Sequence, residues 1–432
     1  MISSFKPGNL VLALLGFLPL IVALLVGPPQ DTPTLAFLGR AAGILGLCFL
    51  LLSGLISLRI PGFDLWFGGL TQLWKVHHVL GAAAFVLVMA HPLLLAFASA
   101  RVSIQAAAAV LFPQSAEWSV WAGWAAFAAM TIFLAPTFWF FGQPKYRRWK
   151  ALHALSGVAI VLGVAHAVPL GRSLAGNWGK TIWLGYGALA LAAFVYRKCV
   201  APRTARKAYT VVNVQLVNRG IVELTLAPDE ELLKYRAGQF IYLTPLDPRL
   251  ASGRNEEHPY TVSSAPGKGM LRVAIKDAGD ATHALQTVAA GGKALVEGPY
   301  GDFFPVKKRT DGELWIAGGI GLAPFLSRAR ALSPDDTVDV HLIYCVQDET
   351  RAHFLSELEA IAAKIPGFRL WKHFFYREGP LSGAFMSVCC PDFPSREIYV
   401  CGPPPLITAA RRELRRHGVP GSRIHTEDFT WL

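Results

Sequence analysis

Long apolar stretches alternate with short polar ones over the first half of the chain. Six of these stretches are each close to the ~20 residues that a helix needs to cross a bilayer. They cover residues 10–26, 35–58, 74–98, 118–141, 150–169 and 180–198. The first lacks a clear signal-peptide cleavage site and shares the character of the others, so we retain it as a span. The pattern predicts a membrane domain of six helices over residues 1–203.

The pattern changes twice after that domain. Short runs such as TVVNVQLV, IVELTLA and QFIYLTP, separated by turn residues, predict an antiparallel β-barrel over residues 206–308. From about residue 313, apolar runs such as LWIA and EIYVC alternate with helical stretches. Alternating strand and helix is typical of a parallel sheet that binds nucleotides, which predicts a Rossmann-like α/β domain over residues 311–432. The predicted fold class is therefore a multidomain membrane protein.

Positive charge is concentrated beside the predicted spans, although the 432-residue chain has a formal net charge of +12. The flanking basic residues are Lys145, Arg147, Arg148, Lys150, Arg197, Lys198, Arg203, Arg206 and Lys207. This distribution follows the positive-inside rule and argues against nucleic-acid binding. It predicts a multi-pass protein of the inner (plasma) membrane with both chain ends and the soluble domains in the cytoplasm.

Four histidines lie within the third and fifth predicted spans. His77 and His91 are 14 positions apart, and His153 and His166 are 13 apart. Each pair is therefore separated by roughly 20 Å along its helix, which is most of a hydrocarbon core about 30 Å thick. Both spans run in the same direction under the predicted topology, so one histidine pair lies near each membrane face. A proton relay explains a lone buried histidine, but two matched pairs predict two bis-histidine haems.

The spacing of 13 raises a geometric problem. A spacing of 14 returns to within about 40° of the starting face, whereas 13 leaves the second ring roughly 140° away. The fifth helix therefore needs a bulge, a kink or a strong tilt to direct both rings to one partner. His78 is a second candidate for the inner ligand, and we favour His77 because its spacing of 14 keeps one face.

Three segments of the soluble half contain residues suited to binding cofactors. His258-Pro259-Tyr260-Thr261, followed by Ser263, resembles the flavin-binding signature of ferredoxin-reductase-type enzymes. An aromatic ring there can stack on a flavin, a hydroxyl can hydrogen-bond its edge, and a basic residue can meet its pyrophosphate. The segment from Lys276 through Gly279 to Thr282 resembles the next flavin loop. Gly298-Pro299-Tyr300-Gly301 resembles the turn that closes the barrel.

Glycines that follow the strand LWIA predict a close approach of the backbone to a pyrophosphate. This segment, Gly318-Gly319-Ile320-Gly321-Leu322-Ala323-Pro324, does not have the G-x-G-x-x-G pattern. Cys401-Gly402-Pro403 follows the strand EIYV. The predicted cofactor-binding residues are His258, Pro259, Tyr260, Thr261, Ser263, Lys276, Gly279, Thr282, Gly318, Gly319, Gly321, Pro324, Gly402 and Pro403.

The chain as a whole resembles the membrane NADPH oxidases and ferric reductases, particularly the short bacterial members. The resemblance rests on the histidine spacings, the His-Pro-aromatic-Thr segment and the order of the glycine and cysteine motifs. It implies two b-type haems held by His77, His91, His153 and His166, together with FAD and NADPH (or NADH). It also implies that Cys401 lies beside the reactive nicotinamide carbon and that a C-terminal aromatic, Trp431 or else Phe429, covers the flavin.

Two positions bear on the electron acceptor. Arg40 stands where oxidase relatives place an arginine near the outer haem, and its charge can stabilise a forming superoxide or anchor the helix at the interface. Leu95 stands where oxidases often carry an additional histidine. We therefore expect electron transfer from cytosolic NAD(P)H to an acceptor outside, with O2 giving superoxide as the first choice. Ferric-chelate reduction and delivery to a periplasmic redox protein are the alternatives.

The choice of nucleotide depends on the end of the predicted third-strand region. Relatives often carry an arginine there that meets the extra phosphate of NADPH, but this chain has Gln347-Asp348. A carboxylate repels that phosphate, and Arg351 or Arg377 is placed to compensate. Family resemblance favours NADPH, with NADH as the alternative.

Overall fold

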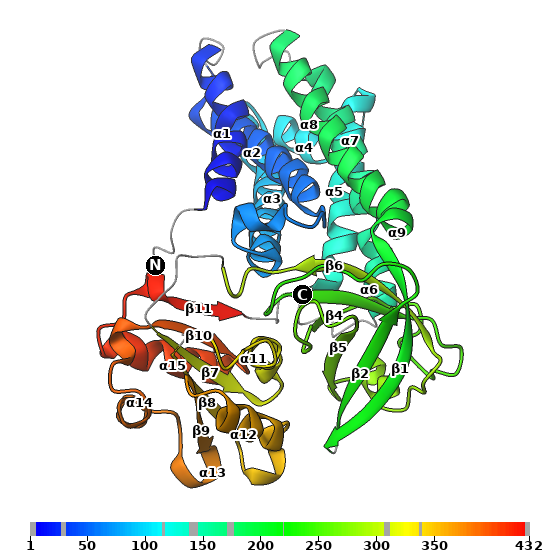
Figure 1. Ribbon diagram of the computed structural model, residues 1–432. Coiled ribbons are helices and arrows are strands. Elements are labelled where there is room, and N and C mark those ends of the chain that lie inside the picture. Colours follow the sequence, from blue (N-terminus) through cyan, green and yellow to red (C-terminus); the bar gives the residue numbers. More distant parts are fainter. Residues whose placement is uncertain are drawn as a thin grey trace. The chain divides into compact units, whose positions relative to one another are not determined.

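The chain folds into two compact units, one helical and one built mainly on sheets (Figure 1). The computed structural model describes residues 6–26, 32–114, 117–137, 146–170, 177–218, 220–305, 312–336 and 339–427. The helical unit comprises residues 6–59 and 72–204. The second unit comprises residues 205–432 together with residues 60–71, which lie between two of the long helices in sequence.

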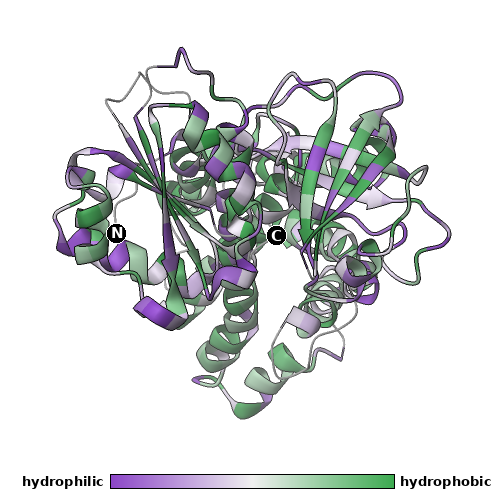
Figure 2. Ribbon diagram, turned by 60° about the horizontal axis from the view of Figure 1, so that its bottom comes forward, coloured by the Kyte–Doolittle hydropathy of each residue, from purple (hydrophilic) through white to green (hydrophobic). Residues whose placement is uncertain are grey.

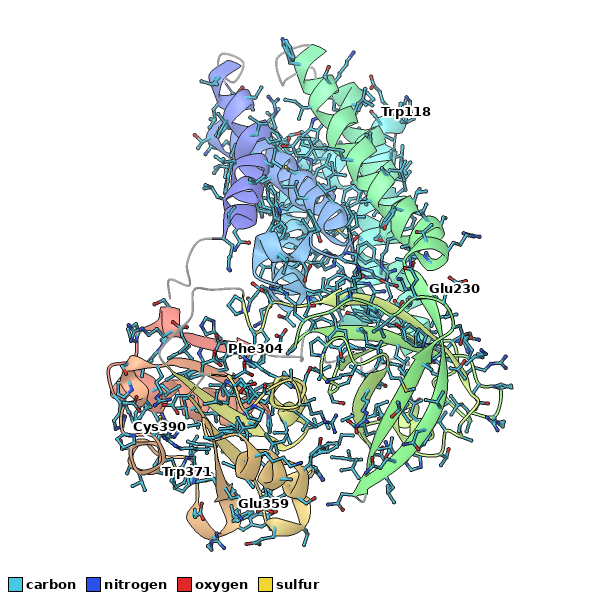
Figure 3. The ribbon with its side chains drawn as sticks, in the orientation of Figure 1. Trp118, Glu230, Phe304, Glu359, Trp371 and Cys390 are labelled. Atoms are coloured by element: carbon cyan, nitrogen blue, oxygen red, sulfur yellow. The ribbon has the colours of Figure 1, made fainter. Side chains whose placement is uncertain are left out.

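Within the described residues of the first unit, six helical segments are long and apolar enough to cross a membrane, as predicted. The helices are α1 (Pro7–Val26), α2 (Thr34–Ile56), α3 (Leu70–Ser99), α4 (Ile104–Leu111), α5 (Trp118–Leu134), α6 (Tyr146–His153), α7 (Ser156–Leu170), α8 (Asn177–Val195) and α9 (Ala201–Thr204). Figure 2 shows the long helices coloured mainly as hydrophobic. Trp118, labelled in Figure 3, is exposed at the first residue of α5, a position typical of an interfacial aromatic.

Small residues allow the helices to approach one another closely. A Cβ atom added to Gly157 of α7 would lie 2.7 Å from the Phe194 ring of α8. One added to Gly187 of α8 would lie 2.7 Å from Val164 of α7. Both distances are too short for a real contact, so α7 and α8 pack together through glycine. This is the small-residue packing expected where lipid gives no hydrophobic drive for association.

The first lobe of the second unit is a curled antiparallel sheet. Its strands are β1 (Arg206–Asn218), β2 (Ile221–Pro228), β3 (Phe240–Pro245), β4 (His258–Thr261), β5 (Leu271–Lys276) and β6 (Lys293–Tyr300). They follow the order β4-β3-β6-β1-β2-β5, and an isolated bridge from Val262 to Val273 joins the two ends. This pairing closes the sheet into the predicted barrel around an apolar core that includes Leu224, Ile241 and Val296. We call residues 206–305 the flavin lobe.

The second lobe is a parallel sheet with helices on both faces, as predicted. Its strands are β7 (Glu313–Gly318), β8 (Val340–Val346), β9 (Phe368–Phe374), β10 (Glu397–Cys401) and β11 (Ile424–Glu427), in the order β11-β10-β7-β8-β9. Its helices are α11 (Ala323–Ala329), α12 (Leu355–Lys364), α13 (Phe375–Glu378), α14 (Gly383–Cys389) and α15 (Pro404–Arg416). We call residues 312–427 the nucleotide lobe.

Alternate strand residues determine which helices cover each face of this sheet. Trp315 and Tyr344 pack with Phe325 of α11 and Leu358 of α12. Their sequence neighbours Leu314 and Ile343 point to the other face, which α14 and α15 cover. Because both faces are buried, the strands are nearly continuous apolar runs, which explains why the sequence pattern identified them.

Residues 60–71 dock on the sheet-containing unit through polar contacts. The buried Asp64 carboxylate accepts a hydrogen bond from the Gly301 backbone N–H at 3.0 Å. The hydroxyl of Thr71 donates to Glu427 of β11 at 3.2 Å. This connection between two apolar helices therefore belongs structurally to the unit that contains the two lobes.

Candidate functional site

The four predicted histidines form two pairs within the helical unit. The ring centres of His77 and His153 are 6.2 Å apart, and those of His91 and His166 are also 6.2 Å apart. Two imidazoles on opposite sides of one iron have ring centres about 6.3 Å apart, from metal–nitrogen bonds of about 2 Å and ring radii of about 1.1 Å. The spacing of both pairs therefore fits a shared metal ion of a haem.

Backbone carbonyls orient three of the four rings. Nδ1 of His91 lies 2.7 Å from the Gly39 carbonyl oxygen, and Nδ1 of His166 lies 2.8 Å from that of Ser119. Nδ1 of His77 lies 3.0 Å from the carbonyl oxygen of Ser53. In each ring, the N–H at Nδ1 donates to the carbonyl oxygen, and the lone pair of Nε2 is left free. This arrangement is usual for histidines that bind a metal ion.

Two glycines provide the space that the outer histidines occupy. A Cβ atom on Gly43 of α2 would lie 2.7 Å from Nδ1 of His91, and one on Gly123 of α5 would lie 2.6 Å from Nδ1 of His166. Real Cβ atoms essentially never approach so closely, so only glycine lets the ring lie flat against the neighbouring helix. Neither glycine is distinguished in the sequence, because a glycine in an apolar helix is typical of ordinary helix packing.

A local change of helix type accounts for about half of the mismatch that the spacing of 13 creates. Helix α6 ends at His153, and α7 begins at Ser156. Between them the amides of Ala154, Leu155 and Gly157 each donate to the carbonyl three residues earlier, at 3.0–3.2 Å. Each 3₁₀ residue turns about 120° instead of 100°, so three or four of them reduce the mismatch from about 140° to about 60–80°. The helix therefore has the irregularity that the spacing required.

His77, rather than His78, faces His153. His78 is exposed, and its Nδ1 lies 2.7 Å from the Trp74 carbonyl oxygen of its own helix. The His153 ring stacks on Trp149 at 5.3 Å, and its Nδ1 is buried with no hydrogen-bond partner among the described residues. The inner pair thus has a less complete set of orienting bonds than the outer pair.

Arg40 follows directly after the residue that orients His91. It is exposed on α2, next to Gly39, whose carbonyl His91 contacts. Leu95 packs against the same glycine, since a Cβ there would lie 3.0 Å from its Cδ2 atom. The position where oxidases often carry a further histidine is therefore occupied by an apolar side chain beside the outer pair.

The predicted flavin segment forms β4 and the residues that follow it. The Tyr260 hydroxyl is buried without a hydrogen-bond partner in the described part of the chain, and burial raises the pKa of this phenol. An orphaned polar atom of this kind fits a site completed by a ligand. His258 is half-buried, with Nε2 3.4 Å from Glu256. Ser263 is fully buried and donates to Glu223 at 2.6 Å, so its hydroxyl is already engaged within the protein.

The second predicted flavin loop is an exposed turn before a short helix. Lys276 ends β5, and Gly279 precedes the six-residue α10 (Asp280–Leu285). Thr282 accepts a hydrogen bond from the Ala278 amide at 2.8 Å and donates to the Gly279 carbonyl at 3.0 Å. The threonine therefore shapes the turn itself.

The glycine and cysteine motifs meet at the carboxyl edge of the parallel sheet. Strands β7 and β10 are neighbours, with Ala317 opposite Cys401. A Cβ on Gly321 would lie 2.6 Å from the Cys401 carbonyl carbon, and one on Gly318 would lie 2.8 Å from Pro403. Glycine thus allows two distant segments to touch through their backbones. Cys401 is buried, Gly319 has a φ of +53°, and Pro324 is the second residue of α11.

Carboxylates surround the end of β8 at this same edge. The hydroxyl of Thr350 hydrogen-bonds Asp348 and holds the pKa of that carboxyl below its usual range. Arg351 lies 3.8 Å from Asp348, and Arg377 lies 3.1 Å from Glu349. Both candidate arginines therefore already have acidic partners. Trp431 and Phe429 lie outside the described residues.

Comparison with known families matches three consecutive parts of the chain. Residues 42–164 match the ferric reductase-like transmembrane component, residues 206–303 an FAD-binding domain, and residues 315–412 an oxidoreductase NAD-binding domain. The chain thus has the domain architecture of the membrane NADPH oxidase and ferric reductase family. The predicted resemblance, fold class and FAD- and NAD(P)-binding domains are confirmed, because a ferric reductase-like transmembrane component precedes FAD- and NAD-binding domains in the chain.

Curated relatives match the reductase half of the chain most directly. It is 32% identical to the ferredoxin reductase component of 3-ketosteroid-9-alpha-monooxygenase from Mycolicibacterium smegmatis, over 46% of this chain and 57% of that protein. It is 29% identical to the flavohemoprotein of Bordetella pertussis, over 64% of this chain and 74% of that protein. The chain thus spans little more than half the length of the first relative.

A solved structure resembles the chain over most of its length. The flavohemoglobin from Malassezia yamatoensis with bound FAD and heme is 16% identical, covers 91% of this chain and 96% of its own, and has a TM-score of 0.50. At this identity the likeness concerns the fold alone.

Proposed function

We propose that the protein transfers electrons across the inner (plasma) membrane, from cytosolic NADPH or NADH to an acceptor on the other side. Bound FAD would accept a hydride and release single electrons, and two b-type haems would carry them through the bilayer. The observation that carries this proposal is the pairing of four histidines at two levels, each with ring centres 6.2 Å apart.

The residues of the chain have distinct proposed roles. His77 and His153 would hold the inner haem, and His91 and His166 the outer one. The carbonyls of Ser53, Gly39 and Ser119 fix the direction of three rings, so that Nε2 is presented to the metal.

The soluble half would bind the two other cofactors. We assign FAD to the segments from His258 to Ser263 and from Lys276 to Thr282, with Tyr260 stacking on the flavin. The backbones of the Gly318–Pro324 and Cys401–Pro403 segments would bind the nucleotide, and Trp431 would cover the flavin. Cys401 lies where the buried end of β10 meets the glycine loop, and we assign it to the nicotinamide.

For the acceptor we propose O2, reduced to superoxide, with the Arg40 charge stabilising the anion. Ferric-chelate reduction and transfer to a periplasmic redox protein are the alternatives. They have to be tested as well, because Leu95 stands where oxidases often carry an additional histidine. NADPH-driven cytochrome c reduction that superoxide dismutase fails to suppress would contradict the oxidase assignment.

Absorbance spectroscopy of the purified full chain tests the core of the proposal. We expect b-type haem bands that shift on addition of NADPH or NADH, together with a flavin signal and two haems per chain. His77→Ala should lower the haem content to about one per chain, whereas His78→Ala should leave it at two. A colourless protein after expression with ample haem supply, or two haems retained in His77→Ala, would overturn the assignment.

A further inference from the structure

Arg330 connects the two lobes of the sheet-containing unit. It follows α11 in the nucleotide lobe, and all five N–H groups of its guanidinium donate hydrogen bonds. Nε and Nη2 bind the Glu357 carboxylate of α12 at 2.7 and 2.8 Å. Nη1 and Nη2 bind the Glu223 carboxylate of β2 at 2.7 and 3.2 Å. Nη1 also binds the carbonyl of Ser263 at 3.0 Å.

These contacts end on β2 and on the predicted flavin segment. Ser263 is the last residue of that segment, and its hydroxyl donates to the same Glu223. The next residue, Ser264, accepts a hydrogen bond through its carbonyl from Ser327 of α11 at 2.6 Å. Ser327 and Arg330, at the end of α11, therefore donate hydrogen bonds to the backbone carbonyls of two consecutive residues of the flavin lobe. Figure 3 marks α12 by the label of Glu359.

The ion pair between Arg330 and Glu223 is buried, and its geometry fixes the relative orientation of the two side chains. The Arg330 side chain is 9% exposed and that of Glu223 is 2% exposed. Burial alone would lower the pKa of Arg330, but the hydrogen bonds to Glu357 and Glu223 outweigh it and raise that pKa. A two-pronged arginine–carboxylate contact fixes orientation in addition to distance. Breaking it would leave the buried Glu223 carboxylate with the more distant Arg272, 3.8 Å away, as its cationic partner.

We infer that Arg330 is a positioning residue for hydride transfer, because it holds α11 and α12 of the nucleotide lobe in register with β2 and the predicted flavin segment. This inference rests on the proposed function. Hydride transfer depends steeply on alignment, and a misplacement of about 1 Å can cost about 100-fold in rate. A guanidinium that bridges Glu223 and Glu357 resists both separation and rotation of the lobes.

The chain offers a matched control two residues away. Arg328 of α11 binds Glu313 at 2.7 Å and lies 4.5 Å from the ring centre of Phe304, labelled in Figure 3. Glu313 belongs to the nucleotide lobe, and Phe304, at the end of the flavin lobe in sequence, packs within the core of the nucleotide lobe. Arg328→Met therefore removes a half-buried ion pair of the same kind without loosening the connection to Glu223.

The test measures flavin reduction in the full-length protein by anaerobic stopped flow, with saturating NADPH or NADH. We expect Arg330→Met to slow reduction by about 10- to 100-fold with little change in nucleotide KM. Arg330→Lys, which keeps the charge but loses the planar fork, should fall in between, and Arg328→Met should stay within twofold of wild type. A rate for Arg330→Met within twofold of wild type would overturn the inference, even if its melting temperature falls.

A second readout does not depend on turnover. Hydrogen–deuterium exchange of residues 262–264 should accelerate in Arg330→Met and not in Arg328→Met. Equal exchange in the two variants would refute the positioning role of Arg330. If Arg330→Met does not fold, Glu223→Gln removes the charge from the other lobe, and it should slow flavin reduction. If neither nucleotide reduces the flavin of the wild-type protein, the proposed function is refuted. If the wild-type flavin is reduced normally and these substitutions do not slow its reduction, only the positioning role of Arg330 is refuted.

Discussion

Replacing Gly43 by alanine tests the outer haem site with a single methyl group. The added Cβ would lie 2.7 Å from Nδ1 of His91, and ordinary contact begins at 3.4 Å. The ring must therefore move by about 0.7 Å, away from α2. If it moves toward His166, the Nε2–Nε2 gap closes from about 4 Å to about 3.3 Å, which is too short for two metal–nitrogen bonds of about 2 Å.

The energies point in the same direction. The shift weakens the His91 hydrogen bond to Gly39, worth about 0.5–1.5 kcal/mol, and overpacking costs about 1–3 kcal/mol. Loss of such an orienting bond typically lowers metal affinity by about 10- to 100-fold. In an ordinary helix, alanine is more stabilising than glycine by about 0.5–1 kcal/mol. A destabilised protein or a lost haem in Gly43→Ala would therefore be opposite to the effect of helix propensity.

The assay is haem content per chain by pyridine haemochrome, together with the reduced absorbance spectrum. We expect about one haem in Gly43→Ala, and the same in Gly123→Ala, whose Cβ would lie 2.6 Å from Nδ1 of His166. Gly185→Ala is the matched control in α8, because nothing lies within 4 Å of its Cβ. Two haems with unchanged spectra in both Gly43→Ala and Gly123→Ala would refute the steric reasoning.

Three further predictions concern the soluble half. Gly321→Ala should destabilise the protein by about 1–3 kcal/mol and weaken nucleotide binding, because its Cβ meets the immovable backbone of Cys401; an unchanged melting temperature and nucleotide affinity would count against this. Asp348→Ser should raise the NADPH-to-NADH ratio of kcat/KM by about tenfold or more, since a carboxylate repels the extra phosphate; an unchanged ratio would contradict it. Burial raises the pKa of the Asp64 carboxyl, so its ionisation opposes docking on Gly301. Exchange protection of residues 60–71 should therefore be greatest below about pH 4 and decline as pH rises through the raised pKa, whereas Asp64→Asn should be insensitive to pH in this range.

The sequence predicted the elements whose signals are local. Six apolar stretches identified the spans, and alternation of short apolar runs with turns or helices separated the two soluble lobes. The spacing of 13 between His153 and His166 also showed that the fifth helix must be irregular, because helix geometry is a property of a single segment. The structure supplies the form of that irregularity, a short 3₁₀ stretch at Ala154.

Contacts between distant segments were decided by the tertiary structure. Gly43 and Gly123 have no periodic signature that distinguishes them from other helix glycines, yet each accommodates a histidine from another helix. Arg330 reads in sequence as one exposed cation among many, whereas in the fold it joins two buried or half-buried carboxylates.

The sequence by itself thus determined which segments span the membrane, which motifs could bind cofactors, and that the histidines come in two levels. Only the tertiary structure decided that His77 rather than His78 faces His153, and that residues 60–71 fold with the lobes. The physical reason is that hydrophobic periodicity reports the environment of each residue averaged over its own helix or strand. The choice of partner depends on close steric fit and on hydrogen bonds between segments far apart in the chain.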